Sequence, residues 1–206
     1  VDILRRMARG SSATQILHTA AKLGIGDYLA TGPRSAAEPA PALQAHPQAL
    51  HRFLRMMVVL ELLTQEDNDS FGLSSLGQLL RADHSESLRD RIIYIGAVNY
   101  PTAEAMLHSV QTGEAAFDHV FGVPFFNHFA QQPELGAIFN QLMKRNVSER
   151  IAGISGAYDF SCVKSIVDIG GGDGALLAAI LNANPQAAGI LFDTPEVNAE
   201  ARISLG

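Results

Sequence analysis

The sequence holds little that would indicate a disulfide, a membrane or a secretion route. Its 206 residues include one cysteine, Cys162, which cannot form a disulfide within the chain. No apolar run approaches the ~20 residues that a membrane-spanning helix needs, and the first residues lack the pattern of a secretory signal. We therefore predict a protein of a reducing, cytoplasmic compartment that has no membrane partner.

Positive charge is also scarce. The chain has 15 Lys and Arg against 21 Asp and Glu, a net charge of −6, and no block of basic residues. Proteins that bind the phosphate backbone of nucleic acids need a basic stripe, because displaced counterions supply much of their affinity. None of the seven histidines lies at metal-ligand spacing from a second ligand. The sequence therefore predicts neither a nucleic-acid partner nor a metal site.

What the chain does contain begins with a helical N-terminal region. Apolar residues recur at helical spacing from Ile3 to Leu29, with an interruption at residues 11–14. Gly24 and Gly26 predict the end of this helix. After a turn, Ser35 predicts the cap of a short helix over residues 36–38.

A stronger helix and a hairpin follow. Pro47 predicts the first turn of a helix that runs to Leu60. Residues 62–64 and 71–73 flank a polar tip and predict a β-hairpin. Three short helices and a hairpin make a winged-helix unit, which we place at residues 1–90.

A winged helix invites a DNA-binding interpretation, with the helix at residues 47–60 as the recognition helix. Residues 1–90 carry 9 Lys and Arg against 10 Asp and Glu, which gives 9 − 10 = −1. On that helix, only Arg52 and Arg55 are basic, and they stand among apolar residues. A buried dimerisation helix is the better interpretation.

The middle of the chain is also predicted to be helical. Residues 85–110 predict a helix that Pro101 kinks or breaks. Residues 117–129 are rich in phenylalanine, and residues 133–150 predict an amphipathic helix. We treat residues 91–160 as a connecting region.

The spacing of apolar residues changes from helical to strand-like at Ser165. Residues 165–169 predict a strand that opens into a glycine-rich turn, residues 170–174, and then a helix. A second strand, residues 189–192, ends in Asp193, which falls 19 positions after Gly174. This pattern predicts a strand–helix–strand unit within residues 161–206.

The turn and the acidic residue together predict a nucleoside pocket at the carboxyl edge of a parallel sheet. Gly170 and Gly172 let the backbone approach a ligand closely, and some glycines there need φ > 0. Asp193 can accept hydrogen bonds from two ribose hydroxyls. Asp168, two residues before the first glycine, can meet a cationic amino-acid group, which favours S-adenosylmethionine. Gly170, Gly172 and Ala175 also satisfy the G-x-G-x-x-A form of NAD or FAD sites, so an oxidoreductase remains an alternative.

Several runs resemble one family. Residues 167–174, Pro185 and residues 189–197 resemble the VDVGGGxG … P … GxxFDLPxV core of plant-type and bacterial small-molecule O-methyltransferases. Upstream, residues 33–38, 50–55 and 71–77 resemble the winged-helix domain of that family. Residues 112–117 and 139–143 resemble its middle helical part.

The resemblance implies a mostly helical winged-helix dimerisation domain, followed by the start of an α/β Rossmann-like methyltransferase domain. It implies S-adenosylmethionine as cofactor and S-adenosylhomocysteine as product, with Gly170 at the methionine end and Asp193 at the ribose. Phe139 and Met143 would line the pocket for a small aromatic acceptor, together with Tyr100, which places the acceptor pocket in the helical connecting region, residues 91–160. The reaction would transfer a methyl group to a hydroxyl of that acceptor.

The resemblance also implies a homodimer. The apolar faces on residues 3–29 and 85–110 favour one independently, since they exceed what a domain of this size can bury alone. The family's catalytic base is expected beyond Gly206, so no catalytic residue is assigned, and we expect the chain to be an inactive fragment when isolated. The alternative from another class is a non-catalytic dimeric relative that serves as a scaffold or regulator.

Overall fold

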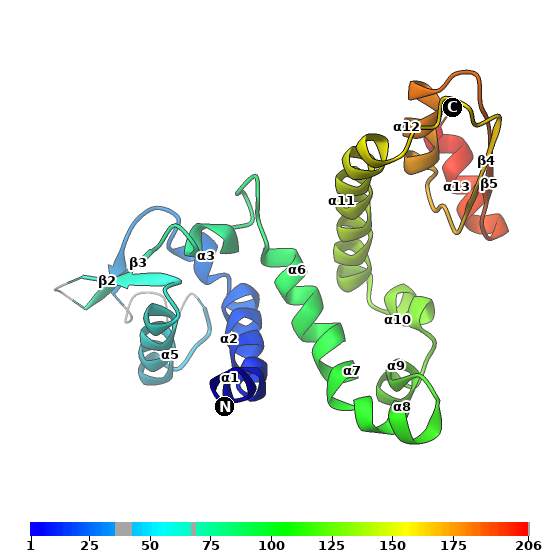
Figure 1. The fold of residues 1–206 in the computed structure, drawn as a ribbon. Helices are drawn as coiled ribbons and strands as arrows, with labels where there is room; N and C mark the ends of the chain where they lie inside the picture. Colours follow the sequence, from blue (N-terminus) through cyan, green and yellow to red (C-terminus); the bar gives the residue numbers. More distant parts are fainter. Residues whose placement is uncertain (36–42, 67–68, 206) are drawn as a thin grey trace. The chain divides into compact units, whose positions relative to one another are not determined.

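The structure, a computed structural model, describes residues 1–35, 43–66 and 69–205. It divides into two compact units, Val1–Phe139 and Asn140–Gly206 (Figure 1). The short helix expected at residues 36–38 lies outside the described residues. Within the described ranges, no helix combines the length and apolar character that a membrane crossing requires.

The first unit begins with helices whose ends follow local signals. They are α1 (Asp2–Ala8), α2 (Gly10–Leu23), α3 (Ile25–Tyr28) and α5 (Pro47–Val59). α2 ends as predicted at Gly24, whose φ of 69° is easily adopted by glycine. The predicted interruption at residues 11–14 is wrong: the break falls at Arg9, and Thr14 instead donates its hydroxyl to the carbonyl of Gly10 within α2.

A small antiparallel sheet accompanies these helices. Its strands are β1 (Arg34–Ser35), β2 (Leu63–Gln65) and β3 (Ser70–Leu73), in the order β1-β3-β2. The pairing of Leu63 with Leu73 confirms the predicted hairpin. β1 was not predicted, because a strand of two residues has no periodicity to detect. The 3₁₀ turn η1 (Gly77–Leu80) follows the sheet.

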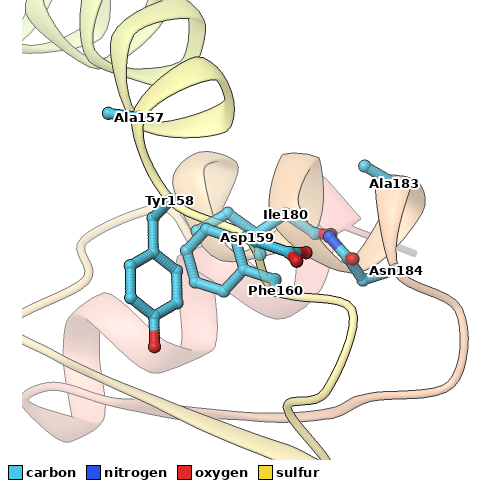
Figure 2. A pocket seen from close by; sticks show the side chains of 7 residues that line it. All are labelled: Ala157, Tyr158, Asp159, Phe160, Ile180, Ala183 and Asn184. Atoms are coloured by element: carbon cyan, nitrogen blue, oxygen red, sulfur yellow. The ribbon is translucent and has the colours of Figure 1, made fainter.

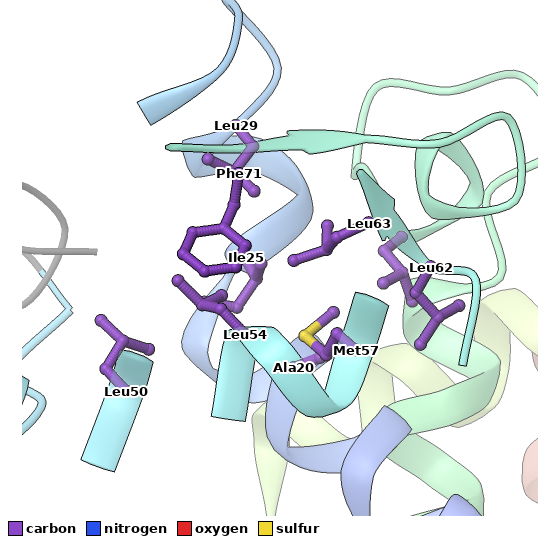
Figure 3. Packing of buried hydrophobic residues seen from close by; sticks show 10 residues of the cluster. Ala20, Ile25, Leu29, Leu50, Leu54, Met57, Leu62, Leu63 and Phe71 are labelled. Carbon is purple, nitrogen blue, oxygen red and sulfur yellow. The ribbon is translucent and has the colours of Figure 1, made fainter. Parts of the chain in front are cut away.

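One apolar core joins α2, α3, α5 and the sheet (Figure 3). α5 buries Leu50, Leu54 and Met57, which are spaced four and three residues apart and therefore share one helical face. Phe71 of β3 is fully buried against them. Each such side chain contributes roughly 1.5–3 kcal/mol when it leaves water.

The predicted helix over residues 85–110 is broken into several elements. They are α6 (Arg89–Tyr94), the π-helical turn η2 (Ile95–Asn99), α7 (Tyr100–Glu104) and α8 (Met106–Thr112). The π turn ends two residues before Pro101, which lacks the N–H that a regular helix needs, and the break itself falls at Ala105. The expected disruption is therefore confirmed, although it extends to both sides of the proline.

The phenylalanine-rich stretch forms two short helices, α9 (Ala116–Phe121) and α10 (Phe125–Gln131). The helix α11 (Pro133–Ala157) follows and continues past the predicted end at residue 150. Val98, Phe117 and Phe129 are buried in a second apolar cluster of the first unit, and Phe139 packs against it.

The second unit contains the strand–helix–strand pattern as predicted. Its elements after α11 are β4 (Ser165–Ile169), α12 (Ala175–Ala183), β5 (Ala188–Phe192) and α13 (Pro195–Leu205). β4 and β5 are parallel and end together, since Ile169 pairs with Phe192. A Cβ at Gly189 would collide with Leu181 and come into tight contact with Leu177, so glycine at that position lets α12 pack closely on β5.

Candidate functional site

The glycine turn begins where β4 ends. Gly170, Gly172 and Gly174 have φ values of 72°, 59° and 75°, a region that side chains strongly disfavour. A Cβ at Gly170 or Gly172 would meet nothing within 4 Å. These two glycines are therefore required by the backbone, and the space beside them is open to a ligand.

Gly171 differs from its neighbours, and sequence analysis assigned it no role. A Cβ there would lie 2.7 Å from the carboxylate of Asp168 and would also collide with Leu191. The carboxylate of Asp168 therefore lies directly against the turn. The run of three consecutive glycines was the sequence signal for this position. Only the packing shows that Gly171 leaves room for the side chains of Asp168 and Leu191.

Asp193 joins the second strand to the turn. The N–H of Gly172 donates to its Oδ2 at 2.9 Å, and the N–H of Thr194 donates to its Oδ1 at 2.7 Å. Because each carboxylate oxygen can accept two hydrogen bonds, each keeps capacity for one more. The fold thus brings together two predicted site residues, Gly172 and Asp193, that are 21 positions apart.

The four predicted cofactor residues, Asp168, Gly170, Gly172 and Asp193, all lie at the carboxyl edge of the parallel pair. Gly170 extends the ladder, since its N–H donates to the carbonyl of Phe192 at 2.8 Å. Ligands of α/β sheets bind outside this edge. The open space, the two carboxylates and the backbone of the turn together make a cradle, whose carboxylates are acceptors for hydroxyl groups and attract cationic groups.

Phe139, predicted to line an acceptor pocket, lies in the aromatic cluster of the first unit. Its ring stacks on Phe129 with centroids 4.5 Å apart and an interplanar angle of 10°. Tyr94 lies 6.0 Å from Phe139 and 6.2 Å from Phe129, and burial raises the pKa of the Tyr94 hydroxyl. Sequence analysis did not single out Tyr94, because nothing local distinguishes it from the other tyrosines.

The other two predicted acceptor residues are placed differently. Tyr100 is the first residue of α7 and is half-buried. Met143 belongs to the second unit, where 39% of its surface is exposed on α11. Within the described residues, Tyr94 is the tyrosine whose ring contacts Phe139.

A hollow of about 520 Å³ lies elsewhere in the second unit (Figure 2). It borders the C-terminal half of α12, whereas the glycine turn precedes the N-terminus of that helix. Tyr158 and Phe160 form its aromatic wall, with ring centroids 4.7 Å apart. The hollow is therefore separate from the cradle. Among the described residues, no group of three or more metal-ligating side chains gathers anywhere.

Two family models match separate parts of the chain. The O-methyltransferase dimerisation domain matches residues 6–83, and the O-methyltransferase domain matches residues 103–205. The chain belongs to the O-methyltransferase family. It combines a dimerisation domain with a methyltransferase domain, which is the order that its sequence predicted.

Individual relatives agree with this assignment. The chain is 40% identical over 196 residues to the phenazine O-methyltransferase PhzM of Lysobacter antibioticus, covering 95% of this chain and 58% of that protein. The structure of the mitomycin 7-O-methyltransferase MmcR matches with a TM-score of 0.82 at 32% identity, over 99% of this chain and 61% of that one.

A third relative shows a bound cofactor. The O-methyltransferase NcsB1 from neocarzinostatin biosynthesis, solved with S-adenosylmethionine and 2-hydroxy-5-methyl naphthoic acid, matches with a TM-score of 0.78 at 31% identity. That match covers 94% of this chain and 60% of NcsB1. The chain thus spans less than two thirds of the length of each of these three relatives.

Proposed function

We propose that the whole protein transfers a methyl group from S-adenosylmethionine to a hydroxyl group of a small aromatic molecule. The observation that carries the proposal is the junction between Gly172 and Asp193, where a carboxylate with spare acceptor capacity borders an open glycine turn. Membership of the O-methyltransferase family supports it, as does the cofactor bound to NcsB1.

Each residue of the cradle is proposed to contact a different part of the cofactor. Asp193 accepts hydrogen bonds from the ribose hydroxyls through the capacity that Gly172 and Thr194 leave free. Gly170 lies at the methionine end, and the carboxylate of Asp168 attracts its ammonium group. When bound, S-adenosylmethionine supplies an electrophilic methyl group.

The acceptor is proposed to be a small aromatic molecule held by Tyr100, Phe139 and Met143. Aromatic rings favour offset-stacked or edge-to-face partners, and the half-buried rings of Tyr94 and Phe139 offer such a surface. These residues position the acceptor, and positioning supplies a large part of the catalysis of a displacement reaction. Removal of the hydroxyl proton needs a base, and we assign that role to no residue of this chain.

The finer architecture is also part of the proposal. Residues 1–90 form a winged-helix dimerisation domain, residues 91–160 connect it, and residues 161–206 begin a Rossmann-like domain. A homodimer is favoured by apolar side chains of the first unit that lie exposed on α1 and α8; these are Ile3, Leu4, Met7, Met106, Leu107 and Val110. The exposed free thiol of Cys162 suits a reducing, cytoplasmic compartment.

Titration calorimetry with S-adenosylhomocysteine tests the cofactor site in the whole protein. Gly170→Val should abolish binding, because a branched side chain fills the open space and φ of 72° is costly for valine. Asp193→Ala should weaken binding at least about tenfold, since a hydrogen bond to a charged group contributes roughly 1.5–3 kcal/mol.

Gly113→Val is the matched control. Gly113 also has positive φ, 79°, and open space around it, but it caps α8 in the first unit. This variant should pay the same backbone cost and bind S-adenosylhomocysteine normally. If Gly170→Val and Asp193→Ala also bind like the wild type, the cofactor site is not at this turn.

Activity is tested separately with labelled S-adenosylmethionine, a panel of phenols and the matching aromatic amines. Label transfer to the phenols supports the proposal. Cofactor binding without transfer to any of them identifies a non-catalytic relative, and transfer to the amines alone contradicts the choice of a hydroxyl acceptor.

A further inference from the structure

The geometry points to Asn198 as a positioning residue of the cofactor cradle, one that acts through Asp193 to fix the carboxylate for the ribose. The inference rests on the proposed function, since it concerns the same cradle. It assigns a role to a side chain that neither the glycine pattern nor the acidic residue at the strand end identifies.

Asn198 lies near the start of α13, and its side chain turns back toward β5. Its Nδ2 donates to the backbone carbonyl of Asp193 at 2.9 Å. Its own backbone N–H donates to the carbonyl of Thr194, as a regular helix requires. The side-chain bond is therefore additional to the helix, and it spans the link between the end of β5 and α13.

The carbonyl of Asp193 and the N–H of Thr194 belong to the same peptide unit. That unit is planar and trans, so a bond that fixes the carbonyl also fixes the direction of the N–H. The N–H of Thr194 donates to Oδ1 of the Asp193 carboxylate at 2.7 Å. Asn198 thus holds the carbonyl edge of a rigid peptide plane, and the N–H on the opposite edge holds the carboxylate.

The second oxygen of the carboxylate is held by the glycine turn that follows β4. Oδ2 accepts the N–H of Gly172, so that both oxygens are fixed by backbone donors before any ligand arrives. Each oxygen keeps capacity for one further hydrogen bond. Two remaining acceptor positions on one rigid carboxylate suit a vicinal diol, which is the group that a ribose presents.

Loss of the Asn198 amide would release the peptide plane. The carbonyl of Asp193 could then turn toward water, and the N–H of Thr194 would turn with it. Because a preorganised acceptor avoids the ordering cost on binding, the affinity for the ribose hydroxyls should fall while the methionine end is unaffected. A purely structural role in α13 would instead lower stability and leave ligand preference unchanged.

The test uses Asn198→Ala and Asn198→Asp in the whole protein. Asn198→Asp keeps the shape of the side chain, removes the donor, and places an acidic residue near the N-terminus of α13, where it favours the helix. This second variant keeps the test informative if Asn198→Ala does not fold. Affinities for S-adenosylhomocysteine and its 2′-deoxy analogue are measured by calorimetry, and folding by thermal unfolding.

Asn184→Ala is the matched control. The Nδ2 of Asn184 donates to the carbonyl of Ile180, also at 2.9 Å and also half-buried, at the end of α12 away from the turn. Both Asn198 variants should weaken S-adenosylhomocysteine binding by about threefold to tenfold, the effect of one lost hydrogen bond. They should also reduce the preference for S-adenosylhomocysteine over the 2′-deoxy analogue, whereas Asn184→Ala should change neither.

The Asp193→Ala background separates a positioning role from an independent one. If Asn198 acts through Asp193, then adding Asn198→Ala to Asp193→Ala should weaken binding by less than about twofold. Additive losses overturn the inference, as does normal affinity with normal ribose preference in both Asn198 variants. Failure of the wild type to bind S-adenosylhomocysteine would instead refute the proposed function itself.

Discussion

The two units bury their apolar side chains to very different degrees. In the first unit, Leu54, Met57 and Phe71 are at most 1% exposed. In the second unit, Ile169 and Phe192 are 77% and 63% exposed, although they pair with each other in the parallel sheet. Backbone pairing does not by itself bury side chains: β4 and β5 pair along their length, while Ile169 and Phe192 at their ends stay exposed.

The difference follows from how many faces each element covers. The sheet of the first unit has α5 and the α2–α3 pair packed around one core. In the second unit α12 buries Leu177 and Ile180, whereas Val167 and Ile190 remain more than half exposed on the strands. Strands that are apolar on both faces are typical of sheets covered on both sides. The exposed side chains of β4 and β5 therefore show that the described residues cover these two strands only in part.

The largest effect expected from this comparison is on stability. Phe71→Ala should lower the free energy of unfolding by about 3–5 kcal/mol, because it leaves a cavity in a closed core. Phe192→Ala, at an exposed position, should lower it by less than about 1 kcal/mol. Urea unfolding followed by far-ultraviolet circular dichroism measures both. Equal losses would show that Phe71 does not lie in a closed core.

A second prediction concerns exposed side chains of the first unit. If α1 forms the proposed dimer contact, Leu4→Glu should weaken the dimer by about a hundredfold, because a charge would be buried without a partner. Val59→Glu, at an equally exposed position on α5, should leave the dimer intact. Sedimentation at micromolar concentration distinguishes the two. A monomeric wild type would remove the dimer from the proposal.

A third prediction sharpens the contrast between a packed and an open glycine. Gly171→Ala should weaken S-adenosylhomocysteine binding by at least about tenfold, because the methyl group collides with the carboxylate of Asp168 and displaces the turn. Gly10→Ala, in a helix with nothing within 4 Å, should bind normally and gain up to about 1 kcal/mol of stability. Calorimetry and thermal unfolding give the two readouts.

The smallest expected effect is a difference in how far salt raises the pKa of two exposed carboxylates, those of Asp83 and Asp159. Hydrogen bonds from the Arg81 guanidinium lower the pKa of Asp83, and the backbone N–H of Ser161 lowers the pKa of Asp159. A lowered pKa means stabilisation that is present above the ordinary carboxyl value and is lost as pH falls through the lowered one. Salt at about 1 M should raise the pKa of Asp83 more, since it screens the guanidinium charge. Carboxyl NMR titrations at two salt concentrations would measure both pKa values. Equal salt-induced pKa shifts of Asp83 and Asp159 would contradict the prediction.

Sequence alone came closest where the signal is local. The strand Ser165–Ile169 and the start of the following helix were placed correctly, since a glycine run marks the boundary between them. Gly24 and Pro47 likewise marked the ends of helices. Predictions were wrong or incomplete where contacts with other parts of the chain determine the secondary structure. The break at Arg9 replaced the one expected at residues 11–14, and β1 exists only because β3 pairs with it.

The same division applies to the cradle. The sequence by itself determined that glycines occupy the turn and that an acidic residue ends the second strand, because backbone freedom and residue type are local properties. Only the tertiary structure decided that Gly172 donates to Asp193, that Gly171 lies against Asp168, and that Asn198 turns back to the strand end. The contacts of Gly172 with Asp193 and of Gly171 with Leu191 join distant segments, and the parallel register of β4 and β5 brings those segments together. The contacts of Gly171 with Asp168 and of Asn198 with Asp193 are close in sequence, but they depend on how the turn and the start of α13 fold, which residue type alone does not determine.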